Sequence, residues 1–316
     1  MERKMTFRNP KINLLIITAT LAVVLLSQID YSVSEKIQYF LLIAGTIVIG
    51  IPHGATDNHI FRKTRLSRSF LGSQKQHFYI IYLLISAFYT GLWLLSPAVS
   101  LVVFLFISVY HFGQSHLFYL QNKISFSLRV FFYILWGSYV LFIPLMYSYH
   151  EAMPVLKQIL GYTPVNLQTI ESIRNPVALG LFAINFLVFL IMGLNRFLPI
   201  KNFLLEILNL VVLGILGYLT PLFVAFITYW ALWHSFNSLV EISTFITNQK
   251  NAIQFKTFYR KALPLTLITF AGIGILFFIT QSFGSKEQLL AVFFIIIAAI
   301  TLPHTILMDF LYREKT

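Results

Sequence analysis

The stretch IVIGIPHGATDNHIF, residues 47–61, places a histidine and an aspartate at the end of a long apolar segment. These two residues, His53 and Asp57, are four positions apart, which is about one turn of a helix. The basic cluster RKTR follows at residues 62–65. Ionisable side chains within membrane segments are rare, energetically costly and usually functional. The stretch therefore predicts a transmembrane helix that carries part of a polar functional site.

The composition is that of an integral membrane protein. Of the 316 residues, 58% are hydrophobic and 11% are charged, and the mean hydropathy is +0.78. A soluble domain has about 25% charged residues, so this chain has too few to form a solvated surface. The apolar segment 13–27 is long for a signal peptide and no cleavage motif follows it. We interpret it as a retained first span.

Hydropathy predicts an all-α fold, a polytopic membrane helical bundle of about ten transmembrane helices in a single domain over residues 1–316. The predicted spans are residues 12–29, 36–61, 78–96, 98–119, 126–146, 176–194, 202–217, 219–243, 262–281 and 288–312. An even number of spans places both termini on one side of the membrane. With cytoplasmic termini, only four of the 23 lysines and arginines lie outside, namely Lys36, Lys157, Arg174 and Lys286. The net charge of +12 thus follows from the positive-inside rule, and no nucleic-acid partner is expected.

The residues available to bind a metal ion are limited. The chain has no cysteine, which excludes disulfides, thiolate ligands and iron–sulfur clusters and leaves nitrogen and oxygen donors. Four of the eight histidines, His59, His77, His116 and His150, lie near predicted helix ends or in loops. We expect these four to be exposed or interfacial.

The other four histidines lie inside predicted spans, and they are His53, His111, His234 and His304. All four spans run from outside to cytoplasm, and each histidine lies about 8 or 9 residues, or about 12–13 Å, from the cytoplasmic end. Neutral imidazole is a common ligand of iron, copper and zinc, and helix bundles build such sites from inward-facing side chains. The shared depth predicts one metal or heme site made by these four residues.

Further polar residues follow these histidines at helical spacing. Asp57 comes four residues after His53 and is expected to accept the second ring N–H of that histidine. Glu241 follows His234 by seven residues, on the same helical face. The intervening turn carries Asn237 and Ser238, which are expected to bond a bound ligand, a water molecule or the backbone. These four residues are the predicted polar surroundings of the metal site.

Four motifs carry a family resemblance: PHGATD at residues 52–57, YHFGQS at 110–115, WHS at 233–235 and TLPH at 301–304. In order, spacing and membrane setting, they resemble the Brp/Blh family of bacterial β-carotene 15,15′-dioxygenases, and the similarity covers about residues 36–312. The resemblance implies an iron(II) enzyme of the bacterial cell membrane that uses O₂ to split β-carotene at its central double bond. The two retinal products would be available to a microbial rhodopsin.

The same resemblance implies that His53, His111 and His234 bind the iron. The family pattern has a second histidine one turn after the position of His234, where this chain has Ser238. His304, at the shared depth, is expected to replace it as the fourth ligand. Such chemistry needs no dedicated acid or base, so the protein would position the polyene and exclude water. Some of the 32 Phe and 16 Tyr residues would line a tunnel for it.

Three other functions are consistent with histidines inside a membrane bundle. The chain would be a heme-binding electron carrier if paired histidines ligate heme, or a transporter if histidine and aspartate form a proton relay. It would be a carotenoid-binding protein if the substrate is held without cleavage. A histidine-box desaturase is disfavoured, because the sequence contains no HxxHH cluster.

Overall fold

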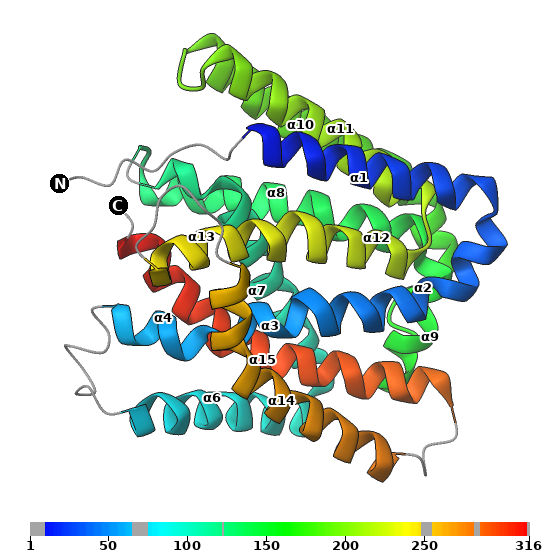
Figure 1. The fold of residues 1–316 in the computed structure, drawn as a ribbon. Coiled ribbons are helices and arrows are strands. Elements are labelled where there is room, and N and C mark those ends of the chain that lie inside the picture. The colour runs from blue at the N-terminus through cyan, green and yellow to red at the C-terminus, as the bar shows by residue number, and fades with distance from the viewer. Residues whose placement is uncertain (1–9, 65–74, 122, 248–254, 281–284, 315–316) are drawn as a thin grey trace.

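The computed structural model describes residues 10–64, 75–121, 123–247, 255–280 and 285–314, and within these ranges the chain is helical without a β-strand. The helices form one bundle (Figure 1). In chain order they are α1 (Pro10–Ile29), α2 (Tyr31–Gly45), η1 (Thr46–Gly50), α3 (Ile51–Gly54), α4 (Asp57–Lys63), α6 (Lys75–Leu95), α7 (Pro97–Leu117), η2 (Phe118–Leu120), α8 (Phe126–Tyr147), α9 (Tyr149–Leu160), α10 (Leu167–Leu194), α11 (Ile200–Leu219), α12 (Leu222–Thr228), η3 (Tyr229–Ser235), α13 (Phe236–Thr247), α14 (Phe255–Thr280) and α15 (Lys286–Glu314).

Eight helical segments in the described part of the chain are long and apolar enough to cross a membrane. They are Pro10–Ile29, Tyr31–Lys63, His77–Leu95, Pro97–Leu120, Phe126–Tyr147, Leu167–Leu194, Ile200–Leu219 and Glu287–Arg313. The predicted fold class, a multi-pass helical membrane protein, is therefore confirmed.

The two other predicted spans, 219–243 and 262–281, are also helical but are not among those eight segments. The first is the continuous rod α12–η3–α13, in which polar residues such as His234 and Asn237 lower the hydropathy. The second is α14, which contains the apolar run at residues 262–280. Both rods lie within the bundle (Figure 1).

The directions of the helices agree with an even number of passes. In Figure 1, α2–α4, α12–α13 and α15 run in the same direction, and α1 begins near the end of the bundle at which α15 ends. The elements that carry His53, His234 and His304 are therefore parallel.

The predicted helix 36–61 is longer than expected and is interrupted around its histidine. It begins after Asp30, whose side chain accepts a hydrogen bond from the N–H of Val33. In the π-helix η1, the N–H of Ile51 bonds the carbonyl of Thr46, five residues back. The helical run then breaks at residues 55–56, between α3 and α4. Asp57 consequently starts a new helix instead of continuing the face of His53.

A second π-helix, η3, contains His234, and the N–H of Phe236 bonds the carbonyl of Ala231 five residues back. Single π-turns inside α-helices occur frequently at functional sites. The two π-helices approach closely, since a Cβ placed on Gly50 would lie 2.6 Å from the ring of Trp230. This contact brings the His53 and His234 segments together.

Helices α7 and α8 are in backbone contact through two glycines. A Cβ on Gly113 would lie 1.8 Å from the carbonyl oxygen of Tyr133, and a Cβ on Gly137 would lie 1.8 Å from that of Val109. Small residues allow this close approach of membrane helices. The contact fixes the part of α7 that carries His111.

Helix α1 is attached to the bundle by buried polar side chains. The Nδ2 of Asn13 donates to the Oδ1 of Asn209 at 2.9 Å, and the indole N–H of Trp233 donates to the hydroxyl of Thr20 at 2.8 Å. The second bond holds the residue next to His234. In an apolar medium, hydrogen bonds between helices fix their relative position, because dispersion forces alone are not directional.

Candidate metal centre and cavity

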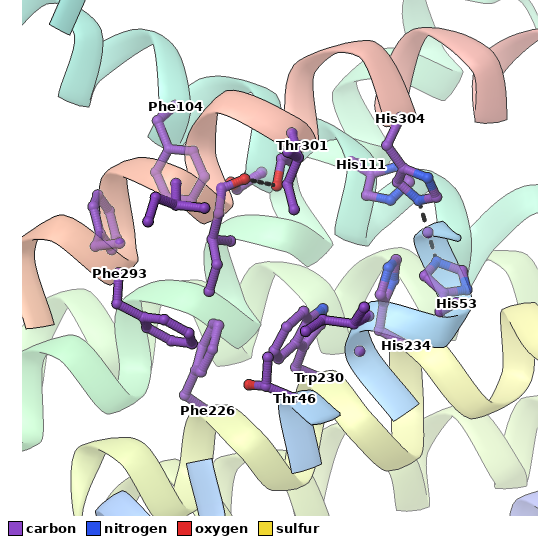
Figure 2. A pocket seen from close by; sticks show the side chains of 18 of the residues that line it. Thr46, His53, Phe104, His111, Phe226, Trp230, His234, Phe293, Thr301 and His304 are labelled. Atoms are coloured by element: carbon purple, nitrogen blue, oxygen red, sulfur yellow. Dashed lines mark hydrogen bonds between the residues drawn. The ribbon is translucent and has the colours of Figure 1, made fainter. Parts of the chain in front are cut away.

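Four histidines from four helical elements meet in the interior of the bundle (Figure 2). His53 comes from α3, His111 from α7, His234 from η3 and His304 from α15. Their exposed fractions are 3%, 2%, 3% and 8%, respectively. The structure thus brings together the four histidines that share a depth in the sequence.

The rings are in direct contact. The Nε2 atoms of His53 and His304 are 3.2 Å apart, and one ring nitrogen each from His53, His234 and His304 lie within 4.8 Å of one another. The ring centroid of His111 is 4.8 Å from that of His234 and 5.3 Å from that of His304. Two nitrogens that share one metal ion, with bonds of about 2.0–2.1 Å, are about 3 Å apart. The spacing of His53 and His304 meets this requirement.

Asp57 is the hydrogen-bond partner of His304, not of His53. Its carboxylate oxygens lie 2.9 and 3.0 Å from the Nδ1 of His304, and its Oδ2 also accepts a bond from the hydroxyl of Tyr82 at 3.2 Å. The prediction that Asp57 bonds His53 is wrong because the break at residues 55–56 redirects the aspartate towards α15. The carboxylate places a proton on Nδ1 of His304, which leaves the Nε2 lone pair facing the cluster.

The remaining ring nitrogens fit a metal ion. Among the described residues, neither nitrogen of His111 has a hydrogen-bond partner, and the Nδ1 of His53 has none. Buried polar atoms normally have a partner, and exceptions indicate an absent ion or water molecule. A buried set of imidazole nitrogens, with its neighbouring carboxylate bonded to His304, suits iron, copper or zinc more than magnesium or calcium. The cluster is a candidate metal site.

The other predicted polar residues do not line the cavity that the histidines line. Asn237 is buried and donates to the backbone carbonyl of Trp233 at 2.7 Å. The hydroxyl of Ser238 lies 3.4 Å from that of Ser115, and Glu241 is half-buried on α13. The cavity described below is not lined by Asn237, Ser238 or Glu241, which all belong to the described part of the chain.

His116 differs from its prediction. It was expected at the membrane interface, yet it is 1% exposed, stacks on Trp136 with ring centroids 3.9 Å apart, and its Nε2 lies 2.7 Å from the Oε2 of Glu206. The prediction is wrong because the partner belongs to α11, 90 residues away. The available signal was Glu206 itself, a carboxylate inside the predicted span 202–217. The Nδ2 of Asn209 also bonds this carboxylate, at 3.1 Å.

The remaining three histidines lie outside the cluster. His59 and His77 are half-buried and His150 is exposed, in agreement with their predicted places near helix ends or in loops.

A cavity of about 1430 Å³ extends through the bundle, and all four histidines line it. Ordinary small-molecule sites measure roughly 300–1,000 Å³, so this one suits a large ligand. Its wall is mostly apolar, and Figure 2 shows Phe104, Phe226 and Phe293 around the space away from the histidines. Residues of α4 and of α9 both line the cavity, and in Figure 1 these helices lie towards opposite ends of the bundle with α3 between them. The cavity is therefore elongated, with the histidine cluster between its ends.

Comparison with known proteins agrees with this geometry. A family model described as beta-carotene 15,15′-dioxygenase matches residues 44–312, which include all four histidines. The chain is 28% identical over 285 residues to the beta-carotene 15,15′-dioxygenase of uncultured marine bacterium 66A03, and the alignment covers 87% of this chain and 94% of that relative. No solved structure matches the chain. With four buried histidines at an elongated apolar cavity and a family match over most of its length, the chain belongs to the beta-carotene 15,15′-dioxygenase family.

Proposed function

We propose that the protein is an oxygenase that cleaves β-carotene with O₂ at the central 15,15′ double bond and releases two molecules of retinal. Family membership supports the reaction. In this chain, the main support for the proposal is the position of the histidine cluster. It lies in the wall of an elongated cavity, between the two ends of that cavity. A long symmetrical polyene that fills both ends presents its middle to the cluster.

The metal ion is iron(II), held by His53, His111, His234 and His304. Bound iron would activate O₂, so that oxygen can add to the electron-rich double bond. All four ligands would be neutral imidazole nitrogens, which are donors that suit iron. His304 takes the place of the histidine that the family pattern has at Ser238, and its hydrogen bond to Asp57 keeps the Nε2 lone pair available.

The chain itself contributes binding, orientation and the exclusion of water. The apolar wall shields the hydrocarbon surface of the substrate from water. The hydrophobic effect holds the substrate there without directional bonds. Trp230 and Phe112 line the cavity close to the cluster: the ring of Phe112 is 5.1 Å from that of His234. These aromatic walls restrict the polyene to a position beside the histidines, and proximity of this kind accounts for much of an enzymatic rate.

A heme site is disfavoured by the distance between His53 and His304. Two histidines on opposite faces of a heme have nitrogens about 4 Å apart, given metal–nitrogen bonds of about 2.0–2.1 Å. The 3.2 Å between the Nε2 atoms leaves no room for a macrocycle between these rings.

The protein resides in the bacterial cell membrane with cytoplasmic termini, and retinal released into the lipid is available to a rhodopsin. The distribution of lysine and arginine supports this orientation. The cluster then lies in the cytoplasmic half of the bilayer.

Expression in cells that accumulate β-carotene tests the function. The wild-type chain is expected to bleach the cells and to produce retinal, which chromatography identifies, and removal of iron or oxygen should stop the reaction. His53→Ala should abolish retinal formation, and His150→Ala, a change of an exposed histidine, should not. Intact β-carotene in cells with well-expressed wild-type protein would contradict the proposal and favour a binding protein.

A further inference from the structure

A groove of about 260 Å³ lies between α7 and α15, and in the described part of the chain it shares no lining residue with the histidine cavity. Its lining is apolar apart from Tyr110 on α7 and Thr305 and Asp309 on α15. Two of its apolar residues, Phe106 and Ile306, are 59% and 41% exposed, so the groove is open towards the surroundings of the bundle. In a membrane protein these surroundings are lipid.

The chemical character of the groove changes along α15. Three of its lining residues, Asp309, Thr305 and Leu302, follow one another at spacings of four and three residues and so share a face of the helix. Arg313 lies one turn nearer the helix end and pairs with Asp309 at 2.7 Å. From the helix end inward, the groove is therefore charged, then hydroxyl-bearing about 6 Å deeper, then apolar. A phospholipid has the same order: phosphate, ester oxygens and acyl chain.

Arg129 places a second positive charge beside the charged end of the groove. It precedes Tyr133 on α8 by four residues, and the ring of Tyr133 contacts that of Tyr110 with centroids 5.8 Å apart. Arg129 and Arg313 both interact electrostatically with Tyr110. The guanidinium of Arg129 is half-buried and lies 5.5 Å from the centroid of the Phe126 ring.

The positive charge of Arg129 is not neutralised within the described chain. No carboxylate among the described residues forms an ion pair with it. The carboxylate of the groove, Asp309, is already engaged, since it pairs with Arg313 and accepts a bond from the Nε2 of Gln114 at 2.7 Å. A half-buried guanidinium of this kind favours an external anion, and phosphate oxygens match its donors.

Thr305 is a second polar group that lacks a partner. Its side chain is 7% exposed, and its Oγ1 has no hydrogen-bond partner in the part of the chain that the structure describes. Buried polar atoms normally have a partner, and exceptions indicate an absent group. The hydroxyl can donate to an oxygen atom that enters the groove from the lipid.

We propose that the α7–α15 groove binds one anionic phospholipid, with its phosphate at Arg129, an ester oxygen at Thr305 and an acyl chain along Phe106 and Ile306. Basic pockets between membrane helices bind anionic headgroups in this way. The site lies outside the histidine cavity, so the inference does not depend on the proposed function.

Native mass spectrometry of the purified full chain measures the binding without catalysis. The probes are dioleoyl phosphatidylglycerol and dioleoyl phosphatidylcholine, which have the same acyl chains and esters but differ in net charge. The wild type is expected to bind phosphatidylglycerol at least about tenfold more tightly, because the choline of the other lipid offsets the charge that Arg129 attracts.

Two variants separate the headgroup from the ester. Arg129→Gln should reduce the preference for phosphatidylglycerol by about tenfold, whereas Arg129→Lys, which keeps the charge, should retain most of it. Thr305→Val should weaken both lipids alike, by about fivefold, because both carry the ester. The matched changes Arg260→Gln and Thr18→Val, at exposed residues that do not line the described groove, should alter neither affinity.

Equal binding of the two lipids by the wild type would overturn the proposal, and this comparison needs no variant to fold. A preference that persists in folded Arg129→Gln, or unchanged affinities in folded Thr305→Val, would do the same. Inorganic phosphate should not displace the lipid, and displacement would show an anion site without an acyl groove. A stable dimer that binds neither lipid would show that a second copy covers the groove instead.

Discussion

The Nδ1 of His304 lies 2.9 Å from a carboxylate oxygen of Asp57, and 247 residues separate these partners in the chain. Both side chains are buried. The bond joins the PHGATD and TLPH motifs and fixes which nitrogen of His304 faces the other histidines. It connects α4 with α15. These helices lie near the two ends of residues 44–312, the part of the chain that the family model matches, and the bond holds them together at the candidate metal centre.

Removing this carboxylate should weaken metal binding. Asp57→Ala is expected to lower the iron affinity by about 10- to 100-fold, because the ring of His304 loses its orientation and its fixed proton. Asp57→Asn should lower it less, since an amide oxygen still accepts the N–H. Iron titration of the purified protein measures both. Asp309→Ala removes a carboxylate from α15 that bonds Gln114 and Arg313, and an equal loss of iron affinity in this control would contradict the role of Asp57.

His116 should matter for stability and not for the metal. His116→Ala leaves the carboxylate of Glu206 buried without its imidazole, a change that typically costs about 3–5 kcal/mol. Thermal unfolding in detergent should show a clear decrease in stability, and the protein that remains folded should retain iron. A folded variant that has lost its iron would place His116 at the metal centre after all.

The backbone contact between α7 and α8 should not tolerate a methyl group. Gly113→Ala is expected to reduce the free energy of unfolding by about 1–3 kcal/mol or more, as overpacking does elsewhere. Gly180→Ala is the control, because its Cβ would meet no atom within 4 Å. Both variants are compared with the wild type by their free energy of unfolding. If both have the wild-type value, α7 and α8 can move apart at Gly113 without cost, which would contradict the prediction.

The bond between Thr20 and Trp233 should support the His234 segment. Thr20→Val keeps the shape of the side chain but leaves the indole N–H without its acceptor, at a cost of about 1–3 kcal/mol. We expect lower stability together with weaker iron binding. Thr18→Val changes an exposed threonine whose hydroxyl bonds only a carbonyl of its own helix. If the two variants behave alike, α1 does not position η3.

The sequence predicted much of the site because hydropathy and charge constrain a membrane chain strongly. The bilayer fixes the length of a span, and the positive-inside rule predicts its direction, so the sequence alone predicts one depth for His53, His111, His234 and His304. The structure brings these four residues together from α3, α7, η3 and α15.

The errors arose where local geometry departs from a regular helix. Asp57 was assigned to His53 on the assumption of one continuous helix, whereas a π-turn at residues 46–50 and a break at 55–56 redirect it. His116 was placed at the interface because its partner, Glu206, is distant in sequence. Neither π-turns nor contacts between distant helices have a periodic signal in hydropathy.

Iron stoichiometry tests the central claim most directly. We expect one iron ion per chain in the wild type and in His150→Ala, and a large loss of iron in each of His53→Ala, His111→Ala, His234→Ala and His304→Ala when these variants remain folded. Full iron content in the four folded variants would contradict a shared metal site made by these histidines.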